Sequence, residues 1–170
     1  MRIAVICTLV VVNVILESTL FQYTRILGIK PDFALMIIVA YGIMRGKAYG
    51  AFIGLGTGLL IDMLYGRAFG INALSYMVTG YIIGQVQENV FKDSFIPAVV
   101  FNFAAVALFQ HLYIFLAYFS NNFPSTDISY VNMLLKVILP QAIYNSIIGS
   151  IVYRLLYRLD ESKLLDKRIY

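Results

Sequence analysis

The chain has 170 residues, of which 61% are hydrophobic and only 13% are charged, and its formal net charge is +4. A soluble domain carries about 25% charged residues and could not hide this much apolar surface from water. The basic residues form no face with interleaved aromatic residues, so the positive charge does not indicate nucleic-acid binding. These properties favour an all-α integral membrane protein.

The apolar residues fall into six segments, which predict a bundle of six membrane-spanning helices. The predicted spans cover 3–21, 33–44, 48–64, 71–86, 95–119 and 131–156. They form one transmembrane domain over 1–158, followed by a short cytoplasmic tail over 159–170. The second span is short for a hydrocarbon core that needs about 20 residues, so five spans plus a re-entrant piece is the alternative. No small-residue cleavage site follows the first segment, so we expect it to stay in place as a span.

Lysine and arginine indicate the orientation of these spans. With both termini in the cytoplasm, most of the basic residues lie on the cytoplasmic side of the membrane, as the positive-inside rule requires. The loop over 120–130, between the fifth and sixth spans, contains no basic residue and is expected outside. The sequence therefore predicts a multi-pass protein with both termini in the cytoplasm.

The third span carries glycines at four-residue spacing, namely Gly50, Gly54 and Gly58, which we call the glycine comb. Asp62 stands at the next position with this spacing, four residues after Gly58. Residues at this spacing lie close to one helix face and drift by about 40° per step. Small residues on one face of an apolar helix let another helix approach closely. We interpret Gly50, Gly54, Gly58 and Asp62 as a packing face, either within this chain or for a helix of a partner protein.

Four ionisable residues are placed in the outer half of the membrane by this orientation: Glu17, Asp32, Asp62 and Lys136. Burying an isolated charge costs several kcal/mol, so these groups are expected to pair, to lose their charge or to reach water. We expect Lys136 to pair with Asp62 or Glu17, and the alternative is that Lys136 extends to the outer headgroups. Pro140, one turn later, is expected to kink the last span.

No residue pattern indicates an enzyme. The sequence contains no HExxH motif, no GxSxG motif and no phosphate-binding loop. Its single histidine, His111, cannot assemble a metal site. The glycines at 54, 56 and 58 lie inside a predicted span and lack the strand that precedes a dinucleotide-binding turn. We therefore expect no catalytic residue, no cofactor and no metal.

Several short pieces of the sequence resemble the MreD family of bacterial rod-shape-determining proteins. They are Pro31-Asp32 followed by FALMIIV, Arg45-Gly46, the GLLID piece over 58–62, Gly70, and the segment from Gly80-Tyr81 to Gly84. The order and spacing of these pieces carry the resemblance, which runs from the first span to the end of the fourth.

The resemblance implies a non-enzymatic component of the cell-elongation complex in the bacterial inner membrane. It implies MreC as the direct partner, and MreB filaments, RodA and a class-B transpeptidase in the wider complex that links MreB to peptidoglycan synthesis. It also implies a fold similar to the substrate-binding subunits of energy-coupling-factor transporters. Such a subunit of a vitamin-type transporter is the alternative function. Against it, the first span offers no small-residue face for a coupling protein, and the outer loops are short.

Overall fold

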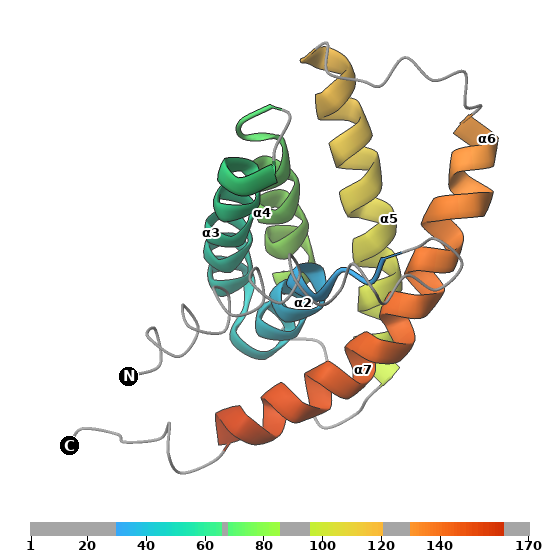
Figure 1. Ribbon diagram of the computed structural model, residues 1–170. Coiled ribbons are helices and arrows are strands. Elements are labelled where there is room, and N and C mark those ends of the chain that lie inside the picture. Colours follow the sequence, from blue (N-terminus) through green and yellow to red (C-terminus); the bar gives the residue numbers. More distant parts are fainter. Residues whose placement is uncertain (1–29, 66–67, 86–95, 121–129, 162–170) are drawn as a thin grey trace.

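The computed structural model describes residues 30–65, 68–85, 96–120 and 130–161, and within these ranges the chain is helical with no strand. Figure 1 shows the helices, which are α2 (Phe33–Arg45), α3 (Lys47–Tyr65), α4 (Ile71–Gly84), α5 (Ile96–Phe119), α6 (Tyr130–Met133), the π-helix η2 (Leu134–Ile138) and α7 (Leu139–Glu161). Each predicted span after the first corresponds to a helical segment, and α6, η2 and α7 together form the last one. The first predicted span, 3–21, lies outside the described residues.

Three of these segments are long and apolar enough to cross a membrane: Lys47–Tyr65, Ile96–Phe119 and Val131–Leu159. The other two, Phe33–Arg45 and Ile71–Gly84, are apolar but shorter. Large apolar side chains also cover much of the outer surface, and Phe52 on α3, for example, is 74% exposed. Such a surface is unfavourable in water and favourable in lipid, so the described helices fit a membrane protein.

The helix α2 lies at the centre of the described fold. It packs against α3, α4, α5 and α7, and every residue from Ala34 to Met44 is buried. Burial on all sides explains why its sequence is apolar all round instead of amphipathic. Its 13 residues extend about 20 Å, which is less than a hydrocarbon core of about 30 Å. The shortness of the predicted second span is therefore a property of the helix itself.

The last helical segment changes direction near Pro140, as the sequence predicts. Pro140 has no N–H, and its ring clashes with the carbonyl group four residues earlier, on Lys136. Just before the proline, residues 134–138 form a π-helix, and the Leu139 N–H donates to the Leu134 carbonyl, five residues back. This wider turn accommodates the proline. Figure 1 shows the resulting bend between α6 and α7.

Candidate functional site

The glycine comb of α3 lies directly against the backbone of α4. A methyl group built at these glycines would collide with backbone atoms of α4: Gly50 with Gly80, Gly54 with Tyr76, and Gly58 with Ala73. The contacted positions move backward along α4 as the glycines move forward along α3, so the two helices run antiparallel. Their close contact needs a hydrogen in place of a side chain at each crossing.

The α4 helix contributes glycines of its own to this contact. A methyl group at Gly80 would collide with the backbone of Gly50, and one at Gly84 would collide with the backbone of Lys47. By contrast, Gly56 lies on the exposed side of α3. Apart from its chain neighbours and its own helix backbone, no described heavy atom lies within 4 Å of its ideal Cβ position. The sequence left two interpretations of the glycine comb open. In the structure the comb packs within the chain, because α4 occupies the face that a partner helix would need.

Asp62 ends the comb and binds the N-terminus of α4. One carboxylate oxygen, Oδ2, accepts hydrogen bonds from the backbone N–H groups of Gly70 (2.9 Å) and Ala73 (3.0 Å). The other, Oδ1, accepts from the backbone N–H of Asn72 (3.2 Å) and from its side-chain amide (2.8 Å). Asp62 is only 5% exposed, and these four bonds supply the donors that a buried carboxylate requires.

This arrangement gives α4 an N-cap from another helix. The residue at the cap position is Gly70, whose φ of 97° lies in the left-handed region that favours glycine, and it has no side chain to accept a bond from the first turn. The first N–H groups of a helix have no partner within that helix, and they favour a negative charge nearby. Asp62 provides both the acceptor and the charge, which explains why an aspartate follows the glycines at the same spacing.

The predicted pairing of Asp62 with Lys136 is wrong. Both residues are described, and no ion pair joins them, because the carboxylate of Asp62 is bound by N–H groups at the start of α4. Lys136 lies on η2 with its side chain exposed. The donors are three backbone N–H groups and the side-chain amide of Asn72 in place of an ammonium group. The other predicted partner of Lys136, Glu17, lies outside the described residues.

Removing the positive charge of Lys136 should therefore have little effect on stability. We expect Lys136→Met to change the free energy of unfolding by less than about 0.5 kcal/mol, as is usual for an exposed side chain without a specific contact. Thermal unfolding of the purified protein in detergent measures this. A loss above about 1.5 kcal/mol that is not additive with the effect of Asp62→Asn would restore the pairing.

Asp32, the second described acid of the predicted outer cluster, joins three helices. Its carboxylate caps α2 by accepting from the backbone N–H of Leu35 (2.8 Å), and it accepts a second bond from the hydroxyl of Tyr76 on α4 (2.8 Å). Its own backbone N–H donates to Oδ1 of Asn145 on α7 (3.1 Å). All of these groups are buried. The Pro31-Asp32 piece therefore fixes the start of the central helix against α4 and α7.

The ring of Tyr76 extends this network to α5. It stacks on Phe109 with the ring centroids 4.2 Å apart and an interplanar angle of 24°. Tyr76 thus contacts α3 through its backbone, α2 through its hydroxyl and α5 through its ring. The sequence gives no sign of this role, because a tyrosine inside an apolar span looks like any other packing residue.

Removing the Tyr76 hydroxyl tests this network without changing the ring. We expect Tyr76→Phe to lower the free energy of unfolding by about 1–3 kcal/mol, because the buried Asp32 carboxylate loses a donor. Tyr81→Phe on the same helix is the matched control, because Tyr81 is exposed and its change should stay within about 0.5 kcal/mol. Equal effects of the two substitutions in a detergent unfolding assay would argue against the Asp32 network.

The helices α5 and α7 are also joined by polar groups. The Gln110 side chain donates to that of Gln141 (2.7 Å). Further along the contact, the side chain of Asn102 packs on Gly149, where a methyl group would lie 2.6 Å from its Cγ. The Asn102 amide donates to the Ala98 carbonyl (2.7 Å). These contacts connect α5 and α7 within the apolar core.

The two described buried acids are both held by hydrogen bonds from structural donors. Asp32 and Asp62 both bind α4, but through different groups, and no hydrogen bond joins the two carboxylates. Within the described ranges, no group of three or more histidine, cysteine or acidic residues could hold a metal ion. The candidate site is the packing centre formed by α2, α3 and α4, with Asp32 and Asp62 fixing the helix starts.

Comparison with known proteins gives one match. A family model described as rod shape-determining protein MreD matches residues 1–162. No curated protein and no solved structure matches the chain. The expected likeness to energy-coupling-factor subunits therefore has no support from solved structures and stays a prediction.

Proposed function

The chain belongs to the MreD family of rod shape-determining proteins, and we propose that it is a non-enzymatic membrane component of the bacterial cell-elongation complex. The observation that carries this proposal is the family match over residues 1–162. The geometry supports it, because the described buried acids are bound by structural donors and three helices are long enough to span a membrane.

We further propose that the protein binds MreC directly and helps to couple MreB filaments to peptidoglycan synthesis by RodA and its class-B transpeptidase. Since α4 covers the glycine comb, the contact with MreC belongs on the outer surface of the helices. One apolar face suited to this runs along α3, where Phe52 and Met63 are exposed and Gly56 leaves open space between them. A helix of a partner could approach closely at Gly56.

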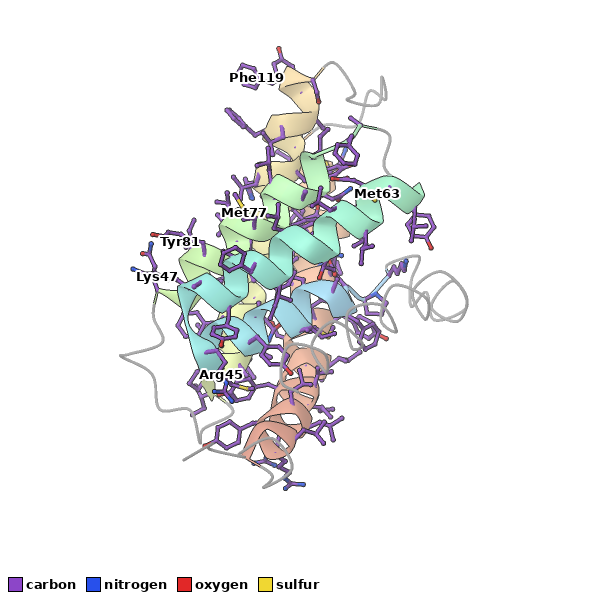
Figure 2. The ribbon with its side chains drawn as sticks, turned by 90° about the vertical axis from the view of Figure 1, so that its left-hand side faces the viewer. Arg45, Lys47, Met63, Met77, Tyr81 and Phe119 are labelled. Carbon is purple, nitrogen blue, oxygen red and sulfur yellow. The ribbon has the colours of Figure 1, made fainter. Side chains whose placement is uncertain are left out.

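The proposed location is the inner membrane, with six spans and both termini in the cytoplasm. The described basic residues support this orientation, because Arg45 and Lys47 lie where α2 ends and α3 begins, and Arg154 and Arg158 lie near the end of α7. Figure 2 shows Arg45 and Lys47 far from Phe119, which precedes the loop proposed to be external. The one proposed span that has no described helix is the first, the predicted segment 3–21, which lies outside the described residues.

Cell shape tests the proposed function. Deleting the gene from its native rod-shaped host should give rounded cells, and expressing the full chain should restore rods. Lys136→Met, on the exposed side of η2, should restore rods as well as the natural chain does. Cells that remain rod-shaped after deletion would contradict the proposal.

A further inference from the structure

The cytoplasmic part of α7 carries a groove with two arginines. The groove has a volume of about 430 Å³, and its described lining residues are Ser150, Ile151, Arg154, Leu155 and Arg158. Arg154 and Arg158 are one helical turn apart and both are exposed. The described lining contains no acidic residue, and no ion pair or hydrogen bond with another described residue occupies either guanidinium group.

An apolar strip leads along the same side of α7 to these arginines. Ile143, Ile147 and Ile151 are all exposed and follow one another at four-residue spacing. At 100° per residue, Arg154 and Arg158 lie within about 60° of Ile151 around the helix axis. From Ile143 to Arg158 the helix rises about 22 Å, which is comparable to a lipid acyl chain with its headgroup.

We propose that this face of α7 binds one anionic phospholipid. Arg154 and Arg158 hold the phosphate, since guanidinium groups bind phosphate oxygens in a bidentate manner. The acyl chain lies along Ile143, Ile147 and Ile151. A soluble anion would not use the apolar strip, and an acidic protein segment would not match a strip followed by cations. Basic pockets at the cytoplasmic side of membrane helices are suited to anionic headgroups.

The proposed site should discriminate between phospholipids by the net charge of the headgroup. A phosphatidylcholine headgroup brings a quaternary ammonium close to the two guanidinium groups, and this repulsion offsets the attraction of its phosphate. Phosphatidylglycerol carries the same phosphate but no positively charged group. The proposal rests on the membrane location and orientation in the proposed function, but not on the binding of MreC.

Native mass spectrometry of the purified full chain in a non-ionic detergent tests the site. Phosphatidylglycerol and phosphatidylcholine with identical acyl chains are titrated separately. Two cationic contacts are expected to favour phosphatidylglycerol by about 30-fold. Arg154→Gln with Arg158→Gln should reduce that preference at least about tenfold. The control, Lys47→Gln with Lys136→Gln, removes the same charge from exposed positions outside the groove and should keep the preference.

Two further variants make the result specific. Arg154→Lys with Arg158→Lys keeps the charge and should keep most of the preference. Ile151→Glu leaves both arginines in place but adds a carboxylate beside them, so it should abolish the preference even if the double glutamine variant fails to fold. Size-exclusion chromatography establishes folding for each variant.

Three results would overturn the proposal. The first is an equal affinity of the natural chain for the two lipids. The second is an equal loss of the phosphatidylglycerol preference in the double glutamine variant and in its control, which would indicate a diffuse charge effect. The third is displacement of phosphatidylglycerol by millimolar inorganic phosphate, which would indicate a site for a free anion. None of these results depends on whether MreC binds or whether the gene determines cell shape, so failure of this inference is distinguishable from failure of the proposed function.

Discussion

Gly54→Ala is expected to lower the free energy of unfolding by about 2–4 kcal/mol, the larger end of the range for overpacking a rigid contact. The added methyl group would collide with the Tyr76 carbonyl oxygen and lie 2.7 Å from the carbonyl carbon. Both atoms belong to the α4 backbone, which cannot rotate away as a side chain can. Relief requires α3 and α4 to separate, and that movement would also disturb the contacts of Gly50 and Gly58.

Gly56→Ala is the matched control, two residues further along the same helix. Its methyl group would enter open space, and alanine favours a helix over glycine by as much as about 1 kcal/mol. We therefore expect this variant to be as stable as the natural chain or slightly more stable. Unfolding in mixed detergent micelles measures both variants. Equal destabilisation by the two substitutions would contradict the packing of α3 on α4.

Asp62→Asn is expected to cost about 2–4 kcal/mol, because it leaves the buried N–H of Ala73 or its partly buried neighbours without an acceptor. Each carboxylate oxygen of Asp62 accepts two hydrogen bonds at the start of α4. An asparagine amide would turn one oxygen into an NH₂ group facing two other donors. Gly70 has no side chain to replace the lost cap, so the first turn of α4 would open. Hydrogen exchange of the amides of Gly70, Asn72 and Ala73 should accelerate along with the loss of stability.

Asn72→Ala is the comparison for this substitution. It removes only the side-chain amide bond at 2.8 Å and keeps the backbone N–H of residue 72 in place. We expect a cost of about 1 kcal/mol, the usual contribution of a single hydrogen bond. If Asp62→Asn were as stable as the natural chain and the amides of 70–73 kept their protection, the capping role of Asp62 would be wrong.

The sequence predicted the described helices well because strong local signals mark their ends. Pro31-Asp32 precedes α2, Gly46 separates α2 from α3, and Gly70 precedes α4. The apolar runs between these signals are long enough to identify helices without knowledge of their neighbours. The regular spacing of the glycines likewise predicted a packing face, although spacing alone could not say which helix lies against it.

The partners of the buried acids could not be predicted in the same way. A sequence displays charged side chains, so a lysine was the expected partner of Asp62. The actual donors include backbone N–H groups, which nearly every residue possesses. The role of Tyr76 was hidden for a related reason. Its hydroxyl reaches Asp32 across 44 positions of the chain, and only the packing of α2 against α4 brings them together.

The most direct test of this account is co-purification of MreC with the tagged chain from native membranes, using the natural chain, Gly56→Leu and Gly54→Ala. We predict that MreC accompanies the natural chain and that Gly56→Leu folds but loses MreC. Gly54→Ala should yield less folded protein, and MreC should decrease only in proportion to that loss. A Gly54→Ala variant that folds normally yet loses MreC would contradict the account, because the comb would then be a partner interface. Recovery of an ATPase complex in place of MreC would contradict the proposed function and favour a transporter subunit.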